Sequence, residues 1–482
     1  MNIRLITRMM GILIIFLGLS MSGPLIVSLV HVDGSEKSLL YSMALTCVLG
    51  LIIFTLAGKP SERYLSHRDG VIIVSLGWIV ACAIATVPYV LSGSITNLTD
   101  AYFESMSGFT TTGASILTDI EKLPMGILLW RSETQWLGGM GIIVLTIAIL
   151  PFLGIGGMQL YKAETPSPVV DKLTPRIADT AASLWKIYII FTVVQIGLLF
   201  GGGMPLFDAV CHTFTTMPTG GFSTKNASIA HYGSLYFDFI IVVFMMIAGT
   251  SFSLHYKLFR GQFTTVKKDP ELRVFWAVVI AFSLLVTYNI YGNVYDSITD
   301  ALRYATFQVV SIITTTGFIT ADYEKWPAFS QLILLMCMFL GSMAGSTGGA
   351  IKFMRFILLL KHSYLEIFRI IHPHATTVVK LGDTPVSQSV LRSIWGFFAL
   401  YMGLFAIATL FMSLLGLDMI SSISSVATCL GNVGPGLGSV GPTNNYSGVP
   451  FLGKWILIFC MLLGRLEIFT IIVLLMPGFW KR

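Results

Sequence analysis

Long apolar stretches separated by short polar ones run along almost the whole chain. The first two, at 8–30 and 38–57, are each long enough to cross a bilayer, since a helical span needs about 20 residues. The later stretches come in pairs. Between the two members of each pair lie a segment too short to span and a Thr/Gly-rich loop. We therefore predict an all-α membrane protein with two N-terminal spans and four modules, each reading span, short re-entrant helix, loop and span.

The loops of the four modules are versions of one sequence. The first reads GFTTTGAS from Gly108, and the others read TTMPTGGF, SIITTTGFIT and TCLGNVGPGLG from Thr215, Ser311 and Thr428. Aligning them places one glycine of each copy in register: Gly113, Gly220, Gly317 and Gly434. A period of about a hundred residues is too long for a solenoid repeat. It indicates four fused copies of one module, related by pseudo-symmetry around one axis.

The predicted boundaries follow from these patterns. Two N-terminal helices lie within 1–60, and the four pore modules occupy 69–160, 183–262, 272–370 and 386–482. The short re-entrant helices are expected at 97–110, 205–217, 297–313 and 418–430. The second spans are expected at 124–153, 235–259, 329–370 and 450–478. The chain should thus have about ten spans and four re-entrant loops.

Composition agrees with a polytopic membrane protein. Hydrophobic residues make up 55% of the chain and charged ones 11%, against about 25% charged in soluble proteins. Lysine and arginine gather in 59–68, 162–186, 257–273 and 352–392 and at both ends, which places these loops and both termini in the cytoplasm. The six cysteines are scattered singly, so neither a disulfide framework nor a protein metal site is expected. No soluble domain, covalent cofactor or nucleic-acid partner is expected either.

The Thr/Gly loops are the candidate functional residues. Non-helical backbone persists at membrane depth only where protein buries it or where it lines a watery path. Stacked carbonyls can replace the hydration shell of potassium, as in the TVGYG loops of tetrameric channels. Glycine supplies the backbone angle that such stacking needs. The expected filter residues, the only ion site predicted, are Thr111, Thr112, Gly113, Pro218, Thr219, Gly220, Thr315, Thr316, Gly317, Asn432, Val433 and Gly434.

Acidic residues begin each short helix, among them Asp100, Glu104, Asp208 and Asp418. They suit a helix N-terminus, and they also suit a mouth that attracts cations. The two interpretations are compatible.

The second span of the third module is interrupted by glycines. Gly345, Ser346, Thr347, Gly348 and Gly349 cannot continue a regular helix, so it should break here. The break is either a notch for close helix packing or a gate below the filter. The run does not fit the phosphate-binding pattern G-x-x-x-x-G-K-[ST].

Two further features carry charge. Arg465 is expected in the middle of a span, where a charge is costly and by default functional. It either pairs with a carboxylate, for which Glu467 is badly placed on a helix, or points into the pore. Lys352 and Arg355 are expected at a cytoplasmic end, within reach of a partner protein.

At this point the sequence resembles a known family, the Trk/Ktr/HKT superfamily of potassium transporters, and within it the TrkH-type subunit. The resemblance covers the whole chain, including the two extra N-terminal spans. It is most specific in the four loops, in TQWLGGMGI from Thr134 followed by PFLGIGGMQLY, and in GSMAGSTGGAIK from Gly341.

The resemblance implies potassium uptake across a bacterial inner membrane by a homodimer with one pore per subunit. It also implies a cytosolic nucleotide-binding partner ring of the TrkA type. The Gly341–Lys352 run resembles the intramembrane gating loop of the family, and Arg465 would be the charge in the pore below the filter. Gly113 stands where sodium-admitting relatives often have serine, which favours potassium.

Two mechanisms remain open. One is a gated channel and the other is a symporter that couples potassium to protons or sodium. Carriers are typically built on inverted repeats, whereas these repeats run parallel, which favours the channel. An enzyme is not expected, since the chain has neither HExxH nor GxSxG.

Overall fold

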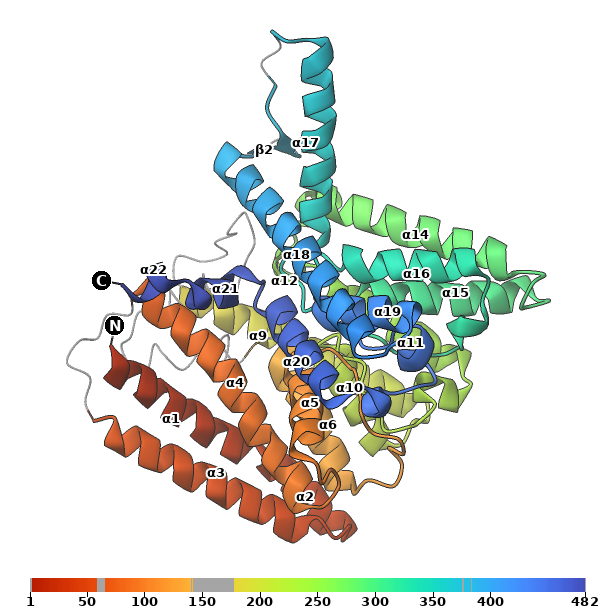
Figure 1. Ribbon diagram of the computed structural model, residues 1–482. Coiled ribbons are helices and arrows are strands. Elements are labelled where there is room, and N and C mark those ends of the chain that lie inside the picture. The colour runs from red at the N-terminus through yellow and green to blue at the C-terminus, as the bar shows by residue number, and fades with distance from the viewer. Residues whose placement is uncertain are drawn as a thin grey trace.

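The computed structural model describes residues 2–58, 66–139, 141, 177–374, 377–382 and 384–481. Most of them are helical (Figure 1). The first half contains α1 Ile3–Ser20, α2 Ser22–His31, α3 Glu36–Leu56, α4 His67–Leu91, α5 Leu98–Phe109, α6 Met125–Gly139, α9 Ile177–Gly201, α10 Leu206–Thr216 and α11 Leu235–Gly249. The second half contains α12 Phe252–Phe259, α13 Phe263–Lys267, α14 Pro270–Ile290, α15 Ile298–Ile313, α16 Ala328–Leu340, α17 Phe353–Ile371, α18 Gln388–Leu414, α19 Met419–Gly431, α20 Phe451–Arg465, α21 Phe469–Leu475 and α22 Pro477–Trp480.

Among the described residues, six helices are long and apolar enough to cross a membrane, or up to eight if two bent pairs each count as one span. The chain is therefore a multi-pass helical membrane protein. The predicted span at 124–153 continues from α6 beyond the described residues. The predicted span at 329–370 is interrupted between α16 and α17, as its glycines predict.

Two of the predicted spans, at 235–259 and 450–478, are sharply bent. The pair α11–α12 bends by 99° and the pair α20–α21 by 117°. Neither break contains proline. Glu467 and Ile468 instead adopt positive φ angles of 53° at the second break, which a residue with a side chain rarely does. The bends are thus imposed by tertiary contacts, and the local sequence does not signal them.

The four short helices α5, α10, α15 and α19 match the predicted re-entrant helices closely. Three of them begin with a side-chain cap. Asn97 Oδ1 accepts from the amide of Thr99, and Ser297 and Asp418 accept from the amides three residues ahead. Such caps satisfy amides that a helix start leaves free. The third short helix, α15, packs against both α14 and α16, which also contact each other (Figure 1).

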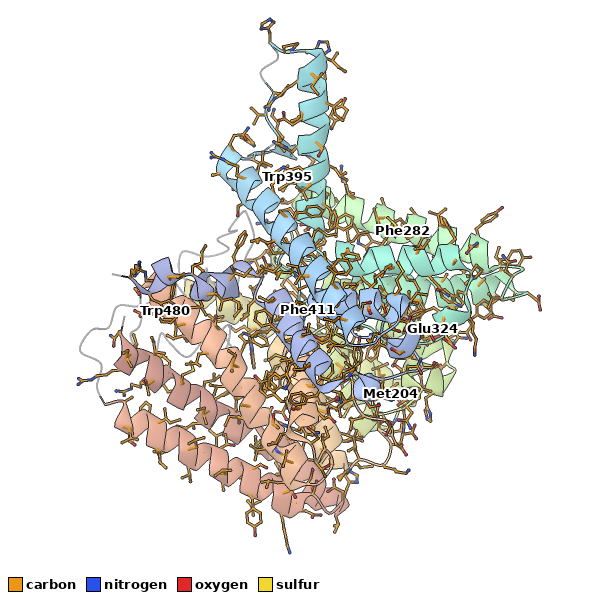
Figure 2. All side chains as sticks on the ribbon, in the orientation of Figure 1. Met204, Phe282, Glu324, Trp395, Phe411 and Trp480 are labelled. Carbon is orange, nitrogen blue, oxygen red and sulfur yellow. The ribbon has the colours of Figure 1, made fainter. Side chains whose placement is uncertain are left out.

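One helix projects from the rest of the described structure. Helix α17 extends beyond the other helices and returns through a two-residue antiparallel hairpin, β1 Lys380–Leu381 and β2 Thr384–Pro385, into α18 (Figure 1). Trp395 on α18 donates through Nε1 to His362 Nδ1 of α17 at 3.2 Å and holds the two helices together (Figure 2). The α17 side chains Leu360, Tyr364 and Ile370 are exposed.

Helices α1 and α3 pack backbone against backbone at the edge of the molecule. A β-carbon on Gly11 would lie 2.9 Å from the carbonyl oxygen of Gly50, and one on Gly50 would lie 2.8 Å from the amide of Ile15. Real β-carbons do not approach so closely, so any side chain at either position must push the helices apart. Small residues at such crossings are how apolar helices gain packing in a membrane.

We predict that Gly50→Leu lowers the apparent melting temperature of the purified protein, because overpacking typically costs about 1–3 kcal/mol. Gly197→Ala is the control, since no described atom lies within 4 Å of a β-carbon there. It should leave the melting temperature unchanged or slightly raised. Thermal unfolding in detergent checks both variants, and equal melting curves would contradict the backbone packing.

Candidate functional site

The four short helices all end in the same strained turn. Within three residues of the end of each helix, one residue adopts the left-handed conformation. These residues are Thr111, Thr219, Thr315 and Asn432, with φ of 54°, 57°, 60° and 53°. The amide of the next residue then donates to a carbonyl five residues back, at 2.8–2.9 Å. Glycine normally occupies this left-handed position, and other residues pay about 1–2 kcal/mol there. Repetition of this strain in four loops marks a functional constraint.

A glycine with positive φ follows two residues after each strained residue. These glycines are Gly113, Gly221, Gly317 and Gly434, with φ of 81°, 74°, 81° and 100°. The predicted register of the second copy, which placed Gly220 with the other three, is therefore wrong by one residue. Its segment is Thr219–Gly221, and Pro218 precedes it. Pro218 could not take the first position, because its ring holds φ near −65°.

The four segments close into a ring. A β-carbon on Gly113 would clash with the carbonyl oxygen of Gly220 in the next copy. In the same way, a β-carbon on Gly221 would meet the carbonyl oxygen of Thr316. One on Gly317 would meet that of Val433, and one on Gly434 would meet that of Thr112. Each loop thus abuts the next one in sequence, and the fourth abuts the first. Every glycine is needed both for its φ and for this close approach.

The junction between the first and second copies is held by a buried ion pair. Arg131 Nε of α6 lies 2.6 Å from Glu104 Oε1 of α5, and both side chains are almost wholly buried. Glu104 also accepts from the amide of Ile116, while Arg131 donates to the carbonyl of Ser223 at 2.9 Å. Glu104 was expected at a helix start. It lies instead in the middle of α5, where it supports the first loop.

Other junctions use different residues. Tyr446 donates through its hydroxyl to the carbonyl of Gly434 at 2.7 Å, and Tyr323 donates to that of Gly436 at 3.0 Å. Glu324 accepts from the amide of Gly438 at the outer edge of the fourth loop (Figure 2). Burial raises the pKa of the Glu324 carboxyl. Sequence reasoning missed both tyrosines, which lie in irregular loops without a motif.

The predicted gate residues lie against the ends of the loops that directly follow the short helices. Thr347 donates through Oγ1 to the carbonyl of Met217 at 3.0 Å, and the amide of Gly349 donates to Thr315 Oγ1 at 2.8 Å. A β-carbon on Gly349 would also meet the carbonyl of Gly431 and the side chain of Asn432. The segment therefore contacts the second, third and fourth copies.

The same segment also forms backbone hydrogen bonds with the break between α11 and α12. Gly345 accepts from the amide of Phe252 at 2.9 Å, where α11 breaks into α12, and Gly249 accepts from the amide of Met343 at 3.0 Å. Ser346 Oγ lies 2.7 Å from Ser342 Oγ. A β-carbon on Gly348 would clash with Ser342 Oγ, so glycine is required there.

Arg465 joins this segment to the first module. It is the last residue of α20 and lies at the break within the bent pair α20–α21. Its Nη1 donates to the carbonyl of Thr347 at 2.8 Å, and its Nη2 donates to that of Gly139 at 3.0 Å. The prediction that Glu467 is not its partner agrees with the structure, since Glu467 pairs with Arg355.

Arg355 and Lys352 face inward, which contradicts their expected position at a partner surface. The Arg355 guanidinium packs 4.1 Å from the centre of the Phe397 ring and bonds Glu467. Lys352 Nζ donates to the carbonyl of Gly348. Both cations therefore stabilise the ends of the broken helices.

A multi-pass helical protein whose chain forms a closed ring of four carbonyl-bearing loops belongs to the class of membrane transport proteins. The family model TrkH, described as a cation transport protein, matches residues 42–481. The chain belongs to this family.

The family match extends to curated relatives. The chain is 42% identical to the Trk system potassium uptake protein TrkH of Salmonella typhimurium, over the full length of both. It is 36% identical to the Trk system potassium uptake protein TrkG of Escherichia coli, over 100% of this chain and 99% of the other. The crystal structure of the potassium transporter TrkH from Vibrio parahaemolyticus superposes with a TM-score of 0.89 at 38% identity, and all of both chains is covered.

The corrected register makes a prediction. Gly221→Ala should abolish cation uptake, because the new methyl group would clash with the carbonyl of Thr316 and the backbone φ of 74° disfavours alanine. Pro218→Ala keeps the β-carbon that packs on Gly139 and should retain uptake. Uptake of a potassium tracer into cells that lack their own uptake systems measures both. Normal uptake by the Gly221→Ala variant would contradict the register.

Proposed function

We propose that this chain takes up potassium through the ring of four loops, with the carbonyls of 111–113, 219–221, 315–317 and 432–434 replacing the ion's hydration shell. The closed contact of four carbonyl-bearing segments is the observation that carries the proposal. Rings of backbone carbonyls select potassium in this way. The relatives named as potassium uptake proteins support the same ion.

We further propose that the segment 341–352 and Arg465 form a gate on the inner side of the ring. The segment is bonded to the second and third copies and packed against the fourth, and Arg465 links it to the end of α6. Opening would break these contacts together. The positive charge of Arg465 adds an electrostatic barrier to a cation.

The setting of this activity is part of the proposal. The protein would work as a homodimer in a bacterial inner membrane with both termini cytoplasmic, as part of a Trk system. Its gate would be controlled by a cytosolic nucleotide-binding ring of the TrkA type. The projecting α17 follows the gate segment directly in the chain, so a partner that moves α17 would move the gate.

A channel mechanism is favoured over coupled symport. Among the residues described around the ring, the buried carboxylates of Glu104 and Glu467 are each held by an arginine. An arginine already occupies each of these carboxylates, so a coupling ion would have to displace it.

The reversal potential separates the two mechanisms. In reconstituted vesicles we expect it to follow the potassium gradient alone, because a carbonyl ring discriminates against sodium. A shift with a proton or sodium gradient at fixed potassium would contradict a selective channel. Gly113→Ser should lower the potassium-to-sodium permeability ratio, and this variant distinguishes weak selectivity from coupling, since only weak selectivity should worsen.

If Arg465 is part of the gate, removing its side chain should change the potassium flux. Arg465→Ala should raise potassium flux in the absence of any partner protein. A hydrogen bond to a charged group contributes about 1.5–3 kcal/mol, so losing one shifts the open fraction roughly tenfold or more. Arg465→Lys keeps the charge and should give a smaller increase. Flux into vesicles made from the chain alone checks this, and unchanged flux in the alanine variant would rule out this role.

A further inference from the structure

The second copy lacks a side chain at the middle of its segment. The first, third and fourth copies have Thr112, Thr316 and Val433 there, whereas the second has Gly220. Gly220 is not among the residues with positive φ, so its backbone does not require glycine. Something other than the conformation of the chain must therefore account for the missing side chain.

The space behind Gly220 is filled by Gln135 of α6. A β-carbon on Gly220 would clash with the amide carbon and oxygen of this glutamine. Gln135 is fully buried, although its side chain ends in a polar amide. A buried polar group in such a place needs partners, and here both ends of the amide have one.

The two hydrogen bonds hold the loop on either side of Gly221. Gln135 Nε2 donates to the carbonyl of Gly220 at 2.8 Å, and the amide of Phe222 donates to Gln135 Oε1 at 3.1 Å. The chemistry of the partners sets the orientation of the side chain, because a carbonyl only accepts and an amide N–H only donates. A carbonyl oxygen has two lone pairs, so Gly220 can accept this bond and still face an ion.

Arg131 provides a second point of attachment from the same helix. Residues four apart lie on one face of a helix, so Arg131 and Gln135 both reach the second copy. The Arg131 guanidinium lies 3.6 Å from the centre of the Phe222 ring and donates to the carbonyl of Ser223. Helix α6 thus holds residues 220–223 along their length.

A comparison of α6 with α11 shows that the glutamine is present where the neighbouring copy has glycine as its middle residue. Gly139 of α6 packs on Pro218, and Gly249 of α11 packs on Thr314, each just before a left-handed residue. Gly249 of α11 therefore corresponds to Gly139 of α6. Gln135 lies four residues before Gly139, so its counterpart is Met245, four residues before Gly249. The copy that Gly249 contacts has a side chain at its middle residue, Thr316.

We propose that Gln135 is a positioning residue for ion discrimination, which takes the place of the side chain missing at Gly220 and fixes the direction of that carbonyl. The inference rests on the proposed function, in which this ring binds potassium. The ring is then unequal: three copies carry a side chain at the middle residue, and in the second copy the Gln135 side chain of α6 occupies that space.

Three variants test this: Gln135→Ala, Gly220→Val and the two combined. Gln135→Ala should lower the potassium-to-sodium permeability ratio roughly fivefold, the scale of one buried hydrogen bond. Gly220→Val alone should lower it at least as much, because valine clashes with the glutamine. The double variant should recover most of the ratio, since its valine occupies the vacated space as Val433 does in the fourth copy. Recovery of this kind is a coupling that two independent defects would not show.

The controls separate positioning from general stability. Gln195→Ala removes the same atoms from α9, where the amide of this buried glutamine has no hydrogen-bond partner among the described residues. It should leave the permeability ratio unchanged. If Gln135→Ala does not fold, Gln135→Met keeps the volume and removes only the amide, and it should lower the ratio as well. Melting temperature and size-exclusion profile are recorded for every variant.

The outcomes are distinguishable. A wild-type ratio in Gln135→Ala or Gln135→Met, with a selective wild-type protein, overturns the role of Gln135 alone. A double variant worse than both single ones also overturns it. A wild-type protein that does not distinguish potassium from sodium overturns the proposed function itself, and the inference with it.

Discussion

Contact between a glycine of one loop and a carbonyl of the next is the interaction on which the rest of this structure depends. It occurs at four places and closes the loops into a ring. Each loop is confined by both neighbours, which explains how three threonines and an asparagine remain in left-handed conformations that cost free energy in isolation. A single loop cannot relax without displacing the next.

The segment 341–352 shows how broken helices satisfy the backbone hydrogen-bonding groups of one another. Unpaired amides and carbonyls are costly at membrane depth, so a helix can break there only if something else bonds the exposed groups. Here the break after α11 and the break after α16 exchange backbone hydrogen bonds through Phe252, Gly345, Met343 and Gly249. Arg465 supplies donors for carbonyls at the end of α6 and in the segment 341–352. The three breaks are therefore joined to one another by hydrogen bonds.

The backbone of the ring is nearly fourfold, but its supports are individual. The first junction uses the Glu104–Arg131 pair and Gln135, while the fourth loop is held by Tyr446 and Tyr323. Fused modules can diverge at such supporting positions as long as the glycine–carbonyl contacts persist. This divergence gives each quarter of the ring its own mechanical and electrostatic surroundings.

The sequence by itself determined the helical membrane class, the four short helices and the break at Gly341. These features are local: apolar length defines a span, Asn97, Ser297 and Asp418 cap helix starts, and clustered glycines end a helix. Only the tertiary structure decided that Gly221 closes the second loop, because two adjacent glycines are locally equivalent until a neighbour's carbonyl selects one. It likewise decided the bends at 250–251 and 466–468, the burial of Glu104 and the partners of Arg355 and Arg465. Each of these results from contacts between residues far apart in the chain, and no local pattern specifies them.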